Sequence, residues 1–202
     1  MSDCCLTLKT CPAADKLRAW FAAGAPGRLT LTRADFPEGR FALLELLSTG
    51  PWAERMRQRW RSFCAWMGRH TPFVGWKTFW YRHAGVSIGE NVHISPGVTL
   101  DLLFPQLITL EDGSVLGLGA IVVSHVYTPD RIVLGRTVVQ KRAFVMAQGI
   151  LAITTIGEES VLATYSYTVK PIPAGHIGIG IPATVRPRDP ELPGEDSHDQ
   201  RA

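Results

Sequence analysis

Aliphatic residues recur every six positions between Val86 and about Lys170. Each hexad begins with an aliphatic residue, as at Ile88, Leu110, Leu116, Leu134, Ile156 and Leu162. Four residues later comes a small or β-branched residue: Val92, Ser114, Ala120, Val138, Ser160 and Ser166. An α-helix repeats every 3.6 residues and a strand every 2, so a period of six fits neither. The pattern predicts a solenoid of short parallel strands that stack coil on coil.

The phase of the repeat predicts which side chains fill the core of this solenoid. We expect a parallel β-helix from about residue 85 to 172. Its inward residues are predicted to be Ile88, Ile94, Leu100, Leu110, Leu116, Val122, Leu134, Ile156 and Leu162. The third coil is irregular, because Gln140 occupies an aliphatic position and Ile156 follows Met146 by ten residues instead of twelve. Either a strand is bulged there or the phase is shifted by one or two residues.

Four segments resemble the hexapeptide-repeat acyltransferases: SIGENVHISPGVTLD, LEDGSVLGLGAIVVSH, IGEESVLATYSYTVKPIP and GIPA. The resemblance covers roughly residues 84 to 188. It implies a left-handed parallel β-helix of triangular cross-section, with three hexads per coil and assembly into a homotrimer. It also implies transfer of an acetyl or longer acyl group from a CoA thioester to a hydroxyl or amine.

The resemblance does not reach the N-terminal third, and we divide the chain accordingly. Residues 1–83 are expected to form a helical region, 84–185 the β-helix, and 186–202, rich in proline and charge, a flexible tail. Within the first region we predict a helix over 15–23 that Gly24 ends, a short strand over 29–32, and a buried helix over 41–47.

The clearest N-terminal element is an amphipathic helix from Pro51 to Met67. Its apolar face consists of Trp52, Met56, Trp60, Phe63, Cys64 and Met67, and arginines occupy much of the remainder. We predict that this face packs against the rest of the protein. The alternative is a basic, tryptophan-rich helix in a membrane interface. Nucleic-acid binding is disfavoured, because no recognisable module surrounds the basic run.

The composition of the 202-residue chain fits a protein inside the cell. A formal net charge of +3 gives little support to nucleic-acid binding by the whole protein. Cys4, Cys5, Cys11 and Cys64 match no zinc pattern, so we expect free thiols in a reducing compartment. We see neither a signal peptide nor a membrane-spanning run. The expected localisation is the cytoplasm, with peripheral contact at the inner face of the membrane as an alternative.

The resemblance implies a catalytic base, and His125 is our candidate. It follows two regular hexads and precedes a break in the pattern with Pro129 and Asp130, where the family keeps this base. Imidazole suits the role because its ordinary pKa lies near neutrality. Asp101 ends the hexad run one coil earlier, where family members carry an Asp or Asn that contacts the acceptor or orients the base. Asp130 is the fallback partner.

The C-terminal coil is expected to bind the acyl donor. By resemblance, Ser166, Lys170, Pro182, Ala183 and Arg186 are the candidate acetyl-CoA contacts. Small residues there let the pantetheine arm lie along the coil, and Lys170 and Arg186 meet the phosphates. Tyr165 departs from the family pattern by replacing a glycine.

These features predict an acetyltransferase that uses acetyl-CoA and no metal, most simply an O-acetyltransferase acting on a sugar, a polysaccharide precursor or another small hydroxyl compound. Two alternatives remain. A zinc carbonic anhydrase of the same fold needs three histidines at a subunit interface, and His93, His125 and His176 are widely spaced. A catalytically silent β-helix would serve as a scaffold or a membrane-associated interaction module.

Overall fold

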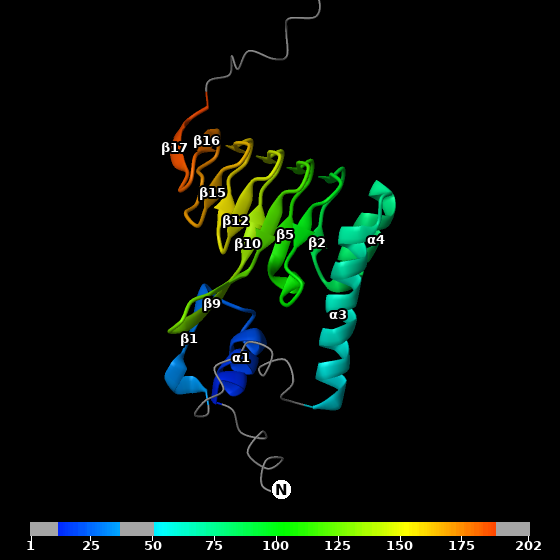
Figure 1. Cartoon of the computed structure of the whole chain (residues 1–202), viewed down its shortest axis with the longest axis vertical. Helices are drawn as coiled ribbons and strands as arrows, with labels where there is room; N and C mark the ends of the chain where they lie inside the picture. Colours follow the sequence, from blue (N-terminus) through cyan, green and yellow to red (C-terminus); the bar gives the residue numbers. More distant parts are fainter. Residues whose placement is uncertain (1–11, 37–50, 189–202) are drawn as a thin grey trace, which may run out of the picture.

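The computed structural model describes residues 12–36 and 51–188, and its centre is a stack of β-coils (Figure 1). Three parallel sheets form the sides of this stack. The first sheet contains β2 (Ser87–Ile88), β5 (Ile108–Leu110), β10 (Thr137–Val139) and β13 (Thr155–Ile156). The second contains β3 (His93–Ile94), β6 (Val115–Leu116), β11 (Phe144–Val145), β14 (Val161–Leu162), β16 (His176–Ile179) and β17 (Thr184–Pro187). The third contains β4 (Thr99–Leu100), β7 (Ile121–Val123), β12 (Ile150–Ala152) and β15 (Tyr167–Thr168).

The hexad residues stack in columns inside the coils. Ile94 pairs with Leu116, Leu116 with Val145, and Val145 with Leu162 across the second sheet. Equivalent columns run through the other two sheets. Seven of the nine predicted inward residues are buried in the core of the coils, and Ile88, which is partly buried, packs against the same core. The parallel β-helix predicted from the six-residue period is therefore confirmed.

The third coil begins at Val139 and not at Leu134. Val139, Val145 and Leu151 supply its inward side chains, so the predicted phase was off by one residue at Gln140. Leu134 is buried, but in a second hydrophobic cluster outside the coils. The physical reason is an excursion of the chain between β7 and β10 that resets the register.

That excursion is an antiparallel hairpin of β8 (His125–Tyr127) and β9 (Arg131–Gly135). The predicted N-terminal strand is present as β1 (Arg28–Thr32), and it pairs antiparallel with β9. Before it, the predicted helix is present as α1 (Pro12–Ala22), and the 3₁₀ turn η2 (Arg33–Asp35) follows it. Leu17 and Trp20 of α1 pack with Leu31 and Leu134 in the second cluster. The N-terminal segment thus supports the hairpin that leaves the β-helix.

Two helices close the end of the stack at which the first coil lies (Figure 1). The predicted amphipathic helix is α3 (Trp52–His70), and α4 (Val74–Ala84), which the sequence analysis did not predict, follows it. Gly85, with φ of +101°, ends α4 in the left-handed conformation that glycine adopts without steric cost. Tyr81 of α4 contacts both α3 and the first coil. Its ring leaves no room for a side chain at Gly68, and its hydroxyl donates to the Val98 carbonyl at 2.9 Å.

The predicted burial of the apolar face of α3 is wrong. Trp52, Met56, Trp60 and Phe63 are exposed by 70%, 42%, 51% and 46%. Of the predicted face, Cys64 is fully buried, and α3 packs through Cys64 and the small residues Ala65 and Gly68. Small residues allow the close approach of α4 there, and the large aromatic side chains are left outward.

Several predictions fall on residues that the structure does not describe. The helix expected over 41–47, the thiols of Cys4, Cys5 and Cys11, and the tail beyond residue 188 lie outside the described residues. Cys64 is a free, buried thiol. At the start of the expected tail, Arg186 and Pro187 belong to β17, which pairs antiparallel with β16.

The core column predicts a large stability difference between two neighbouring leucines. Leu116 is fully buried between Ile94 and Val145, whereas the side chain of Leu118 is 56% exposed. Leu116→Ala should lower the free energy of unfolding by about 2–5 kcal/mol, because it leaves a cavity in the coil. Leu118→Ala is the matched control and should change it by less than about 0.5 kcal/mol. Denaturant unfolding checks both, and equal effects would contradict the assigned phase.

Candidate active site

The β-helix brings Asp101 and His125 together although 24 residues separate them. Asp101 directly follows β4, and His125 begins β8 just after β7. Because β4 and β7 are neighbours in the third sheet, their ends lie side by side. Nδ1 of His125 lies 2.6 Å from Oδ2 of Asp101, a short hydrogen bond. The pair sits where the chain leaves the coils at two places, through residues 102–107 and through the β8–β9 hairpin.

The Asp101 carboxylate is fully buried and saturated with donors. Oδ1 accepts the backbone N–H groups of Leu103 at 2.8 Å and Phe104 at 3.0 Å, and Oδ2 accepts the N–H of Ser124 at 2.8 Å. Burial acts to raise the pKa of this carboxyl group, but the hydrogen bonds and charge of His125 and the two backbone donors Ser124 and Phe104 outweigh it. The net pKa is lowered, so Asp101 is ionised at neutral pH.

An ionised Asp101 fixes the tautomer of His125. A carboxylate only accepts hydrogen bonds, so Nδ1 of the imidazole carries the proton and Nε2 keeps a free lone pair. The ring packs edge-on against Phe104 with the centroids 5.9 Å apart, and its side chain is 22% exposed. Within the described residues, Nε2 has no hydrogen-bond partner. The imidazole is thus oriented and open on one side, as a general base requires.

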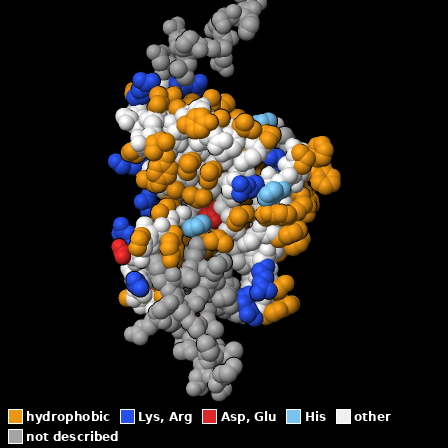
Figure 2. Space-filling model, viewed as in Figure 1, with side chains coloured by type: hydrophobic (Ala, Val, Ile, Leu, Met, Phe, Trp, Pro, Cys, Tyr) orange, Lys and Arg blue, Asp and Glu red, His pale blue; other side chains and the backbone are white. Residues whose placement is uncertain are grey.

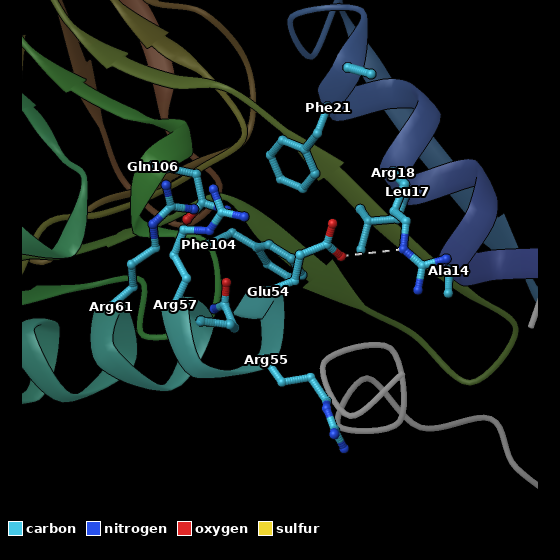
Figure 3. A pocket seen from close by; sticks show the side chains of 12 residues that line it. Ala14, Leu17, Arg18, Phe21, Glu54, Arg55, Arg57, Arg61, Phe104 and Gln106 are labelled. Atoms are coloured by element: carbon cyan, nitrogen blue, oxygen red, sulfur yellow. Dashed lines mark ion pairs between the residues drawn. The ribbon is translucent and has the colours of Figure 1, made fainter. Parts of the chain in front are cut away.

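Next to this pair lies a cavity of about 510 Å³ between α1, α3 and residues 104–106 (Figure 3). Phe104 belongs to both, since it lines the cavity and contacts the His125 ring. The apolar part of the lining comes from α1 and Phe104. The polar part is dominated by cationic side chains: Arg18, Arg55, Arg57 and Arg61.

The positive charge of this cavity is only partly compensated. Glu54 is the only acidic residue among those that line the cavity, and it pairs with Arg18 at 3.5 Å. Burial, with the charge of Arg57 as the second cause, lowers the pKa of the Arg61 guanidinium. Arg55 Nε and Gln106 Oε1 are buried without a hydrogen-bond partner in the described part of the chain. A ligand with anionic and hydrogen-bonding groups would satisfy these atoms.

The predicted donor residues lie apart from His125, at the C-terminal coil. Ser166 is buried, and its hydroxyl accepts the N–H of Gly180 at 2.9 Å, so it positions the backbone of the GIPA segment. Ala183 donates its N–H to the Tyr167 carbonyl at 2.8 Å. Lys170, Pro182 and Arg186 are exposed beside this segment. These five residues therefore share one end of the β-helix.

Tyr165 sits at a corner of the last coil with φ of +54°. Glycine adopts this backbone conformation without the cost that a Cβ brings, which explains why the family pattern has a small residue here. The Tyr165 side chain points outward and is 70% exposed, so the fold tolerates the departure.

The structure separates what the sequence analysis found from what it missed. His125 and Asp101 meet, whereas the fallback partner Asp130 lies in the turn of the β8–β9 hairpin. Phe104, Arg57 and Arg61 were not predicted as site residues. The signal for the two arginines was the arginine-rich run of α3, and Phe104 had none.

The chain has no group of three or more histidine, cysteine, aspartate or glutamate side chains placed to hold a metal ion, within the ranges that the structure describes. His93, His125 and His176 begin three different strands, β3, β8 and β16.

A left-handed β-helix of hexapeptide type, interrupted by a hairpin that carries a histidine, defines the class of fold to which this chain belongs. No protein-family model matches the chain. A curated relative, "Putative acetyltransferase YvoF" of Bacillus subtilis, is 24% identical over 121 residues, which are 59% of this chain and 70% of that protein.

Solved structures confirm the fold. The hexapeptide-repeat acetyltransferase VCA0836 of Vibrio cholerae in complex with acetyl-CoA aligns with a TM-score of 0.57 at 14% identity, covering 67% of this chain and 88% of that one. A galactoside acetyltransferase in complex with coenzyme A aligns with a TM-score of 0.51 at 13% identity, covering 75% and 84%. The resemblance to the hexapeptide-repeat acyltransferases, which rested on four sequence segments, is thus confirmed at the level of the fold.

The buried carboxylate predicts how Asp101→Asn changes stability. An amide cannot accept from all four donors, so one buried donor loses its partner and stability falls by about 1–3 kcal/mol at neutral pH. The folded pKa of Asp101 is lowered, so its contribution is present above the unfolded value near 3.8 and disappears as pH falls through the folded value. Urea unfolding of both proteins should therefore give a stability gap that narrows below about pH 4. A gap independent of pH would contradict an ionised Asp101.

Proposed function

We propose that this protein is a CoA-dependent acetyltransferase that moves the acetyl group of acetyl-CoA to the hydroxyl of a small saccharide-type acceptor. The observation that carries the proposal is the short Asp101–His125 hydrogen bond at the edge of a hexapeptide-repeat β-helix. Two proteins with this fold, described above, were solved with acetyl-CoA or coenzyme A. Nε2 of the partly exposed His125 supplies the proton acceptor that the reaction needs.

In the proposed mechanism His125 acts first as a base and then as an acid. Nε2 takes the proton of the acceptor hydroxyl while the oxygen attacks the thioester carbonyl, and a tetrahedral intermediate forms. The carbon–sulfur bond then breaks, and the imidazolium returns the proton to the leaving CoA sulfur. Asp101 keeps the proton on Nδ1 throughout and stabilises the imidazolium with its negative charge.

The donor is proposed to lie along the third sheet, toward the C-terminal coil. In that sheet β15 is two strands from β7. At the usual spacing this is about 10 Å, a distance that an extended pantetheine arm spans. Lys170 and Arg186 are exposed beyond β15 and are proposed to bind the CoA phosphates. Ser166 holds the Gly180 backbone, and Pro182 and Ala183 follow in the turn that borders the arm.

The acceptor is proposed to enter from the arginine-lined cavity. Phe104 lines the cavity and its ring contacts His125, so the cavity and the base lie on either side of one aromatic ring. Arg57 and Arg61 offer a site for a phosphate, and a volume of about 510 Å³ suits a sugar-sized compound. We therefore infer that the acceptor is a phosphorylated sugar or a related polysaccharide precursor.

A homotrimer in the cytoplasm completes the proposal. The outward faces of the coils carry exposed apolar side chains, among them Phe144 of β11 and Met146, which follows this strand. Closed symmetry is the usual way to cover such surfaces. The free thiol of Cys64 agrees with a reducing compartment, where acetyl-CoA is available.

His125→Ala should reduce kcat by roughly 10²–10⁴-fold, the usual contribution of a positioned acid–base group. The imidazole is partly exposed at the edge of the coils, so fold and acetyl-CoA affinity should be retained. The rate of free-thiol release from acetyl-CoA with a panel of phosphorylated sugars measures turnover. His93→Ala is the matched control, because His93 is an exposed histidine on β3 of the first coil. Unchanged turnover in His125→Ala would exclude this base, and loss of fold would favour the scaffold alternative.

The basic residues of the cavity and those of the proposed donor site should affect KM for different substrates in steady-state kinetics. Arg57→Gln and Arg61→Gln should raise KM for a phosphorylated acceptor by roughly tenfold or more, the weight of a charged hydrogen bond, without changing KM for acetyl-CoA. Lys170→Gln and Arg186→Gln should raise KM for acetyl-CoA without changing KM for the phosphorylated acceptor.

The matched control for the cavity variants is Arg59→Gln, because this exposed arginine lies on the outer side of α3 and does not line the cavity. The wild type should prefer the phosphorylated form of a sugar to the unphosphorylated form. If both forms react equally well, the assignment of the cavity to an anionic acceptor is wrong.

A further inference from the structure

The outer side of α3 and α4 displays one continuous aromatic surface, which we call the aromatic face. Figure 2 shows hydrophobic side chains projecting along this edge of the molecule, with basic side chains among them. The most exposed members are Trp52 at 70%, Phe73 at 68% and Trp76 at 65%. The face comprises Trp52, Met56, Trp60, Phe63, Trp66, Phe73, Trp76 and Phe79, each at least 42% exposed. Soluble domains rarely expose apolar side chains of this size in one contiguous patch.

Ring contacts join part of the aromatic face across both helices. Phe63 contacts Trp60 and Trp66 along α3, with centroids 5.8 Å and 6.4 Å apart. It also meets Trp80 of α4 edge-on at 6.2 Å, and Trp80 contacts Phe79 at 5.4 Å. These contacts join exposed rings of α3 and α4 through Phe63 and Trp80.

The fold holds this patch outward. Tyr81 and Lys77 lie on the inner side of α4, where both are buried, and they donate to backbone carbonyls of the first coil, at Val98 and Ser95. Gly68 of α3 lies directly against the Tyr81 ring. Turning either helix to bury its aromatic side chains would break these contacts. The aromatic face is consequently a permanent surface of the described structure.

The charge around the face is positive. Seven lysines and arginines and one acidic residue, Glu54, lie between residues 52 and 84, but Arg55, Arg57 and Arg61 line the cavity and Lys77 is buried on the inner side of α4. Arg59 and Arg69 are exposed on α3, and in the described structure neither has an ion-pair or hydrogen-bond partner through its side chain. His70 and His83 stack on Trp66 and Phe79, with centroids 4.5 Å and 4.2 Å apart. The face therefore combines apolar rings with uncompensated cations.

We propose that the aromatic face binds the interface of a membrane that contains anionic phospholipid. Tryptophan favours the headgroup region, and arginine pairs there with lipid phosphates. A second copy of the chain fits less well, because self-association would bring Arg59 and Arg69 close to the same cations of the partner. None of the described helices is long and apolar enough to cross a membrane, so the contact is interfacial. This proposal does not depend on the proposed acetyl transfer.

Vesicle flotation of the full chain tests the proposal. The protein should float with phosphatidylcholine vesicles that contain phosphatidylglycerol, and less with phosphatidylcholine alone. High salt should release it, because screening weakens the attraction between arginine and the anionic surface. Tryptophan fluorescence should shift to shorter wavelength on binding. Equal binding to both vesicle types, or none to either, would overturn the proposal.

Variants separate the contributions of the rings and the charges. The double variant Trp60→Ser/Trp76→Ser should lose flotation, and Arg59→Glu/Arg69→Glu should lose the preference for anionic vesicles, by roughly fivefold or more per site. Leu118→Ser is the matched control: it removes a comparably exposed apolar side chain from the β-helix and should float like the wild type. Circular dichroism verifies that each variant folds.

Light scattering without vesicles identifies the competing occupant. If the particle mass of the Trp60→Ser/Trp76→Ser variant is lower than that of the wild type, and neither protein floats, a second copy covers the face and the membrane proposal is wrong. If the mass is the same in both proteins and only the wild type floats, the membrane is the occupant.

Discussion

The Asp101 carboxylate is the point on which the candidate site depends. It accepts the N–H groups of Leu103 and Phe104, which start one departure from the coils, and the N–H of Ser124, which starts the other. Its fourth donor is His125. A buried charge is costly unless it is fully hydrogen-bonded, and here each bond also fixes a backbone direction. One side chain therefore joins two irregular segments to a regular repeat and orients the base between them.

Helix α3 borders two environments. Arg57 and Arg61 face the cavity beside Phe104, while Trp60 and Phe63 face outward. The small residues Ala65 and Gly68, together with Cys64, are buried and let α4 pack closely. If both proposals hold, an acceptor in the cavity lies within the thickness of one helix, about 10 Å, of a membrane surface. A polysaccharide precursor attached to a lipid would be accessible in that arrangement.

The sequence predicted the repeat well because the physical rule behind it is local. Ile94, Leu116 and Leu162 follow from a period that no helix or simple strand shares, and His125 and Asp101 stand at the ends of regular hexads. The phase error at Gln140 has a different origin. The hairpin from His125 to Gly135 interrupts the repeat, and its strand β9 pairs with β1, about 100 positions earlier in the chain. A local period cannot predict where the repeat resumes after such an interruption.

The other misses also concern tertiary contacts. Periodicity identified Trp52, Met56, Trp60 and Phe63 as one face of a helix, but it cannot tell what covers a face. Helix α4 was missed because aromatic residues on several sides, among them Trp76, Phe79 and Tyr81, hide the period. The cavity arginines were missed because the cavity exists only where α1, α3 and Gln106 meet.

Different secondary-structure elements close the two ends of the coil stack. Helix α4 lies against β2 and β3 at one end, and β17 turns back antiparallel on β16 at the other. Free strand edges would invite further coils or a neighbouring molecule, so these closures fix the number of coils. If the donor is anchored at the C-terminal coil and the base at β7, that number sets the reach between them. The number of coils then determines, in steps of one coil, how long the arm that delivers the acyl group must be.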